Sequence, residues 1–370
     1  MARISFLLGL TTCLLTLLPS TIGVEIHEIF TLPRTGTTNG GCGDRMNVLD
    51  QWLGESIRSV GVALDAINDY DNDARVRKSM AKFFRIHNGG KLPETGIRVD
   101  AVQEVKDNLQ YVEDFLNHET IGETADFIYN SDNYWLFCHS NFLVAHGNTD
   151  PALDYEADII LDEDGNQVRI GDIPEYVAQL EKEPNAIPWW AGSSGLNGYY
   201  FTETGGNFCN GDNLGLTASI QPLQRNANNQ AEEDDLLASV ILCPHAFDGS
   251  KRPNNYREAN SLLREGINLA DAVPKSATLL HELFHALRGD AFLAGDDEIY
   301  DIASCIDLAN RNGAEARQNP ESYVFFVAHM YHMLGTPDAE DPDGSINKQW
   351  DFKVQGKDRV FGAFENPSRT

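Results

Sequence analysis

Basic residues are scarce in this chain. Its 370 residues include 28 Lys and Arg against 56 Asp and Glu, which gives a formal net charge of -28 at pH 7. Such an excess of negative charge repels phosphate backbones and anionic lipid surfaces and attracts basic molecules, although a solvated acidic surface explains most of it. We therefore expect neither a nucleic-acid partner nor a membrane partner.

Long apolar runs are absent beyond the N-terminus. Arg3 precedes an apolar run from Ile4 to Leu18, and small residues follow as far as Gly23. A positive start, an apolar middle and a small-residue end are typical of a secretory signal peptide. The run ends at Pro19, short of a comfortable bilayer span. We predict that residues 1–23 are a cleaved signal peptide and that the mature protein is secreted, extracellular and soluble.

Cysteines are few, and Asn-X-Ser/Thr glycosylation acceptors are absent. The chain has six cysteines, of which Cys13 lies in the predicted signal peptide. The remaining number is odd, so at most two intramolecular disulfides can form. Cys305 lies in an amphipathic helical pattern and is our candidate for a buried free thiol. The expected pairing is then Cys42 with Cys138 and Cys209 with Cys243.

Periodicity divides the chain into helical ends and a β-prone middle. Apolar residues recur at helical spacing over 45–70, 74–88 and 100–119, whereas short β-prone runs lie between 127 and 247. Helical patterns return over 261–269, 276–288, 298–310 and 320–334. Because helices and strands are segregated, we predict one α+β domain over 42–336, preceded by an irregular segment 24–41 that could be a short propeptide and followed by an irregular tail 337–370.

The stretch SATLLHELFHALRGD carries the chemistry. His281 and His285 lie one helical turn apart, so their imidazoles can share one metal ion. Glu282 points about 100° around the helix, away from the ion but close to a water that the ion would bind. Zinc with three protein ligands and an open position activates such a water, and a carboxylate can take its proton. These residue types fit peptide hydrolysis.

The third ligand is not given by the common extensions of this motif. An extended motif would need Gly at 288 and a ligand at 291, where the chain has Arg288 and Ala291. Another class of zinc peptidase takes its third ligand from a glutamate about twenty residues further on, but this chain has no glutamate near Ser304. Acidic residues do follow the helix, namely Asp290, Asp296, Asp297 and Glu298.

The order of these residues resembles the aspzincins, the metalloendopeptidases that include the deuterolysins and the fungal peptidyl-Lys enzymes. Their HExxH is followed about ten residues later by GTxDxxYG, and this chain has HELFH and then AGDDEIYD, with Asp297 and Tyr300 at the D and Y. Ala294, Gly295 and Asp301 depart from that pattern. The flanking stretches VILCPHAF and NPESYVFFVAHM also resemble family segments.

The resemblance implies a zincin-like fold, with a helical N-terminal part, a small sheet and the HExxH helix. It implies zinc ligands His281, His285 and Asp297, with Glu282 as general base and Tyr300 as a donor to the developing oxyanion. Asp297 also keeps a three-residue step to Tyr300, which on a helical turn places both on one side. Asp296 stays open as a substitute. Asp290 is too close to the helix end, and Glu298 is expected to point elsewhere.

These observations lead to a functional hypothesis. We expect a secreted zinc-dependent endopeptidase with one Zn²⁺ per chain, a monomer that acts on protein or peptide substrates. The main alternative is a secreted, non-catalytic zinc-binding or antigen-like protein, which would have no need of Glu282. A zinc hydrolase that acts on a non-peptide substrate is a third hypothesis.

Overall fold

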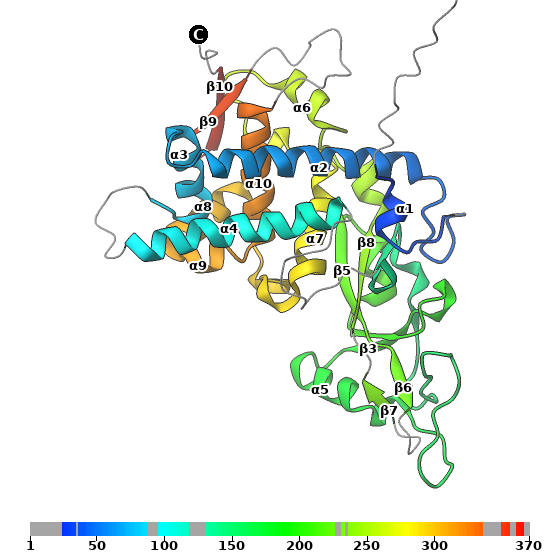
Figure 1. Ribbon diagram of the computed structural model, residues 1–370. Coiled ribbons are helices and arrows are strands. Elements are labelled where there is room, and N and C mark those ends of the chain that lie inside the picture. The colour runs from blue at the N-terminus through cyan, green and yellow to red at the C-terminus, as the bar shows by residue number, and fades with distance from the viewer. Residues whose placement is uncertain are drawn as a thin grey trace, which may run out of the picture.

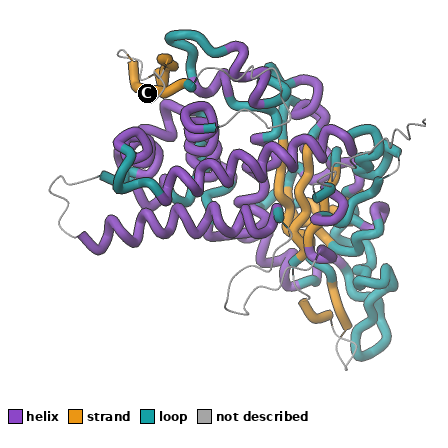
Figure 2. Tube along the Cα trace, turned by 45° about the horizontal axis from the view of Figure 1, so that its top comes forward, coloured by secondary structure: helices purple, strands orange, loops and turns teal. Residues whose placement is uncertain are grey.

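The computed structural model describes residues 24–34, 36–87, 95–117, 131–225, 231–233, 236–335, 349–355 and 360–365. The chain is a mixed α+β protein, as the sequence predicts, and most of its helices gather in one half and most of its strands in the other (Figures 1 and 2). The predicted signal peptide lies outside the described residues. Within those ranges no helix is both long and apolar enough to cross a membrane.

Three helices predicted from the first third of the chain are present, and all three belong to the helical half. Helix α2 (Met46–Asn68) lies beside α4 (Thr95–Leu116) and α10 (Pro320–Leu334) (Figure 1). Its buried face places Trp52 in an offset stack with Phe247, with ring centroids 4.8 Å apart. The other helices of this half are α1 (Ile26–Ile29), α3 (Ala74–Phe84), α6 (Tyr256–Leu262), α8 (Ile302–Arg311) and α9 (Gly313–Ala316).

In its described residues, the β-prone middle forms two three-stranded sheets and one two-stranded sheet instead of the one small sheet expected. In the first sheet, β8 (Leu237–Leu242) is central, pairing in parallel with β1 (Tyr134–Phe137) and antiparallel with β5 (Gly215–Ile220), which lies at the edge. The second sheet has the order β2-β3-β4 and packs against α5. The remaining bounds are β2 (Val144–Ala145), β3 (Ile187–Trp190), β4 (Tyr199–Thr202), β6 (Leu223–Arg225), β7 (Ala231–Glu233) and α5 (Pro174–Lys182).

The cysteine prediction is confirmed. Disulfides join Cys42 to Cys138 and Cys209 to Cys243, and Cys305 is a buried free thiol. Two disulfides are compatible with an extracellular protein.

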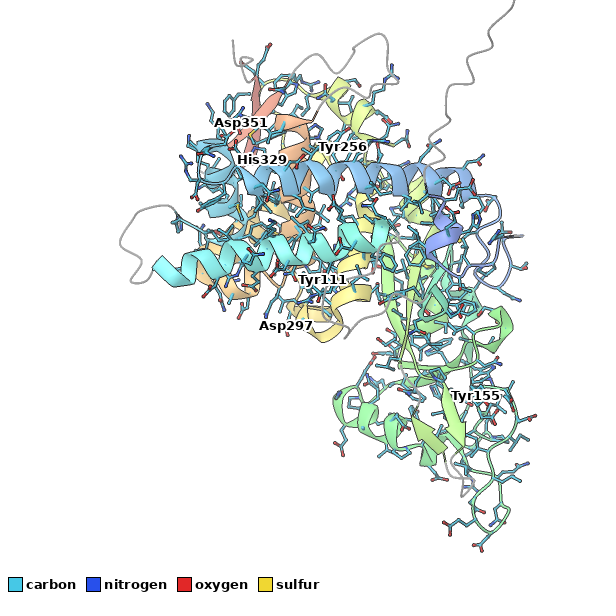
Figure 3. All side chains as sticks on the ribbon, viewed as in Figure 1. Tyr111, Tyr155, Tyr256, Asp297, His329 and Asp351 are labelled. Atoms are coloured by element: carbon cyan, nitrogen blue, oxygen red, sulfur yellow. A yellow bond between two sulfur atoms is a disulfide. The ribbon has the colours of Figure 1, made fainter. Side chains whose placement is uncertain are left out.

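The terminal segments are more ordered than the sequence suggests. The prediction of an irregular tail is wrong where the structure describes it, because β9 (Trp350–Gln355) and β10 (Val360–Glu365) form an antiparallel hairpin. Asp351 on β9 lies 2.9 Å from His329 Nε2 on α10, and the two are neighbours in Figure 3. At the other end, Ile26 and Ile29 of α1 are fully buried, so the segment expected to be irregular contributes to the core.

Helix α7 (Ala277–Arg288) joins the two halves. It packs against β5 and β8 on one side and against α2, α4 and α10 on the other. Leu279, Leu283 and Phe284 are fully buried between these layers. Gly289 ends the helix with a positive φ of 46°, a conformation that favours glycine. The HExxH residues therefore sit on a helix held on both sides, at the boundary of helices and sheet.

Candidate metal centre

Two histidines and one glutamate converge at this boundary. His281 and His285 are one turn apart on α7, with ring centroids separated by 5.3 Å. Glu298 Oε1 lies 2.9 Å from His281 Nε2 and 3.3 Å from His285 Nε2. One ligand atom from each of the three residues lies within 4.8 Å of the others. This is the arrangement of a three-ligand metal centre.

The two nitrogen–oxygen distances are compatible with a bound metal ion such as zinc. Zinc bonds of ~2.1 Å in a tetrahedral site separate the ligand atoms by about 3.4 Å. The two nitrogen–oxygen distances, 2.9 and 3.3 Å, need only a small outward shift of Glu298 to reach that value. Two imidazole nitrogens and one carboxylate are also a donor set that zinc uses in catalytic sites.

The third acidic residue is not the one expected. The structure does not bring Asp297 to the histidines: its side chain is exposed, and Figure 3 shows it at the lower edge of the helical half. Glu298, expected to point elsewhere, is 7% exposed and meets both imidazoles, so that expectation is corrected. The side chains of the other two acidic candidates, Asp290 and Asp296, lie outside what the structure describes.

The reason is the backbone. The sequence pattern favoured a helix from residue 298, but α8 begins only at Ile302. A 3-10 turn over Gly295–Asp297 ends before Glu298, whose φ of -80° and ψ of 141° are extended. In an extended chain, residues two apart share a side, so Glu298 and Tyr300 lie on the same side; Glu298 is buried against the histidines, Tyr300 stays largely exposed with its hydroxyl on Glu298, and Asp297 faces solvent.

Asn319 holds this extended segment in place. Its side-chain amide accepts from the backbone N–H of Ile299 at 2.9 Å and donates to the carbonyl of Ile299 at 3.0 Å. Asn319 is the N-cap residue of α10, but its side chain makes no capping hydrogen bond there. Pro320 occupies the first turn of α10. Asn319 therefore bonds both backbone polar groups of Ile299 and so holds its neighbours, Glu298 and Tyr300, in place.

Tyr300 contacts the centre through Glu298. Its hydroxyl donates to Glu298 Oε2 at 2.7 Å, and its ring stacks on His281 with centroids 5.7 Å apart. Burial and the hydrogen bond to Glu298 raise the pKa of the Tyr300 phenol. In this arrangement the hydroxyl orients a ligand candidate, and a role at an oxyanion requires it to leave Glu298.

Glu282 is buried between α7 and the edge strand β5. Thr217 Oγ1 donates to Glu282 Oε2 at 2.9 Å, and a Cβ placed on Gly215 would lie 2.5 Å from Glu282 Oε1. Glycine at 215 therefore leaves the space that the carboxylate fills. Burial raises the pKa of the Glu282 carboxyl, while His281 and His285 nearby oppose the shift. A buried carboxyl of raised pKa is suited to exchanging protons.

A second carboxylate lies behind His281, and the sequence reading missed it. Glu321 Oε2, at the start of α10, is 3.0 Å from His281 Nδ1. Its other oxygen, Oε1, accepts from Arg252 Nη2 at 3.3 Å. Glu321 is 2% exposed. The sequence does mark Glu321 as unusual, because NPESYVFF places this acidic residue in the first turn of a long apolar helix. Only the fold shows that its partner is His281.

A cation could balance the charges of this group. Glu282, Glu298 and Glu321 are all buried, and Arg252 is the only lysine or arginine paired with them in the described part of the chain. With no ion, burial would lower the pKa of His281, but hydrogen bonds to Glu298 and Glu321 raise it to about 10. Burial likewise opposes ionisation of Glu298, yet its histidine partners lower its pKa to about 2. A divalent cation with neutral imidazoles would balance the charges that a proton on His281 balances only in part.

Comparison of the chain with protein-family models, with curated proteins and with solved structures found no match. The functional proposal therefore rests on the residues and on the geometry of this centre.

Proposed function

We propose that the chain is a secreted zinc-dependent endopeptidase with a zincin-like catalytic domain and one Zn²⁺ per chain. The observation that carries the proposal is the convergence of His281, His285 and Glu298 beside the buried carboxyl of Glu282. His281 and His285 would bind the ion through Nε2. Glu298 takes the third ligand position in this proposal, in place of Asp297.

The residues around the ion have separate tasks. Zinc bound there would act as a Lewis acid and lower the pKa of a coordinated water. Glu282 would accept a proton from the attacking water and deliver it to the leaving amine. Thr217 keeps that carboxyl in place. Tyr300 holds Glu298 and could turn to the substrate once its hydroxyl is released.

The edge strand supports a peptide as the substrate. Between Gly215 and Ile220, no described strand pairs with the outer edge of β5. An extended peptide could add to this edge through backbone hydrogen bonds. Thr217, in the middle of β5, contacts Glu282, so such a peptide would pass beside the proposed base. A non-peptide substrate would make no use of the strand.

The alternative of a non-catalytic zinc-binding protein is less well supported. The two histidines and Glu298 complete a metal site without Glu282, and burying an additional carboxylate costs free energy. Thr217 and the space left by Gly215 position the Glu282 carboxyl beside the proposed ion. A role in proton transfer explains this position. Zinc capture alone does not explain it.

The test is a digestion assay on the secreted protein. Casein and a quenched fluorescent peptide library would be incubated with the protein, with and without a zinc chelator, and again after zinc is restored. We expect cleavage within both substrates that the chelator abolishes and zinc restores. Zinc binding with no cleavage would favour the non-catalytic alternative, and zinc-dependent hydrolysis of small esters or amides alone would favour another hydrolase class.

A further inference from the structure

His281 differs from His285 in having both ring nitrogens engaged by carboxylates. Its Nε2 faces Glu298 and its Nδ1 faces Glu321, at 2.9 and 3.0 Å. For His285, the one ring nitrogen with a carboxylate partner among the described residues is Nε2, which faces Glu298. The two proposed ligands are therefore held to different degrees, although they occupy the same helix.

Glu321 is held on its other side by Arg252. The arginine comes from the loop between β8 and α6, and Glu321 comes from α10, so three segments distant in sequence meet at His281. With Oε1 occupied by Arg252 Nη2, Oε2 is left to accept from His281 Nδ1–H. A neutral imidazole that carries its proton on Nδ1 has a lone pair on Nε2, which is the atom directed at the centre.

We infer that Glu321, anchored by Arg252, is a positioning residue that fixes the tautomer and ring orientation of His281 for metal binding. The inference rests on the proposed metal centre but not on peptide hydrolysis. A carboxylate behind a ligand histidine increases the basicity of the imidazole, and loss of such a partner typically weakens metal binding 10–100-fold. Glu321 meets Nδ1 of His281, whereas Nε2 faces Glu298, so the effect of Glu321 would pass through His281.

The substitution Glu321→Gln removes the negative charge of this partner. The amide oxygen of glutamine can still accept from His281 Nδ1–H, but the amide NH2 then faces Arg252 Nη2, which is also a donor, so the arginine anchor is lost together with the charge. We expect the zinc dissociation constant, measured by competition with a chromophoric chelator, to rise about 10–100-fold. Glu321→Ala removes the acceptor as well and should raise it further.

A matched control comes from Glu55, a second buried glutamate linked to the same helix. Glu55 Oε2 accepts from the hydroxyl of Ser276 at 2.6 Å, immediately before α7, and Glu55 Oε1 accepts from the backbone N–H of Tyr256 at 2.9 Å. Glu55→Gln should lower the free energy of unfolding, since it weakens two buried hydrogen bonds, but leave the zinc dissociation constant within about twofold of the native value.

The outcomes separate the two hypotheses. Failure of the unsubstituted chain to bind zinc would overturn the metal centre and with it the proposed function. Tight zinc binding that Glu321→Gln leaves unchanged would overturn the positioning role alone. The role would also be overturned if Glu55→Gln and Glu321→Gln weakened zinc binding equally, because the effect would then follow general destabilisation of α7.

Discussion

Tyr300 and Glu298 are joined by a hydrogen bond of 2.7 Å from the phenol to Oε2, and they lie on the same side of an extended segment. The other oxygen of Glu298 faces both histidines of α7. Asn319 clamps the residue between the two. These interactions together place Glu298, and not Asp297, against the histidines, and this choice has a direct test.

Removing Glu298 should remove zinc, and removing Asp297 should not. For Glu298→Ala we expect zinc affinity to fall by more than the ~10–100-fold that loss of an outer partner costs, because a direct ligand is lost. Asp297→Ala is the matched control, since it deletes the adjacent, exposed carboxylate. Equilibrium dialysis followed by metal analysis measures both. Full zinc in the Glu298 variant with loss in the Asp297 variant would restore Asp297 as the ligand.

Glu282→Gln should keep zinc and lose turnover. The amide fills the same space and can still accept from Thr217, but it cannot take a proton from water. General-base catalysis is worth ~10²–10⁴-fold, so kcat should fall at least ~10²-fold. The assay is peptide cleavage at saturating zinc, with bound metal measured on the same sample. Near-native cleavage by this variant would rule out Glu282 as the base.

Gly215→Ala should affect catalysis through the position of Glu282. The added Cβ would lie 2.5 Å from Glu282 Oε1, so the carboxyl must move from the place where Thr217 holds it. We expect kcat to fall by about tenfold or more, from the sensitivity of catalysis to small misplacements, with zinc retained. Gly211→Ala is the control, because a Cβ there meets nothing within 4 Å. Equal effects of the two substitutions would show that the gap at Gly215 has no special role.

The helix that bears His281 and His285 can be predicted from the sequence, but the third ligand candidate cannot. His281, Glu282 and His285 are set by helical periodicity, which is local, and Cys305 was identified as the free thiol by the same kind of pattern. Asp297 and Glu298 differ by one position, so the choice between them depends on whether the chain is helical or extended there. That is decided by Asn319, more than twenty residues further on. Glu321 and Arg252 could not be linked to His281 from sequence, since their contact needs three packed segments.

The C-terminal hairpin shows the same limit. Its sequence contains many turn-forming residues and was read as irregular. In the structure, Phe352 on β9 packs against His329 and His332 of α10, with ring centroids 5.4 and 6.0 Å apart. A two-stranded hairpin is only marginally stable alone, so this hairpin depends on its packing against α10. The sequence does not show that α10 and the hairpin are neighbours.

His332 should make the protein less stable in acid. Its Nε2–H donates to the carbonyl of Ala272 at 2.9 Å, while Nδ1 is buried and has no hydrogen-bond partner among the described residues, so a second proton would find no acceptor there. Burial lowers the pKa of His332 to about 4, against an ordinary value of 6.5. Between these values the unfolded chain binds more protons than the folded one, so the free energy of unfolding decreases as pH falls. From pH 7 to pH 5 the contribution of His332 is about 2 kcal/mol, as an order of magnitude.

His332→Gln tests this dependence, because glutamine can donate to Ala272 and does not titrate. The variant should lose about 2 kcal/mol less than the native protein between pH 7 and pH 5, whatever its stability at pH 7. Urea unfolding at both pH values, in zinc-free buffer, gives the four free energies needed. The exposed His87 provides the control, and His87→Gln should keep the native pH dependence. If His332→Gln loses as much stability in acid as the native chain, the buried Nδ1 is not the group that senses the pH.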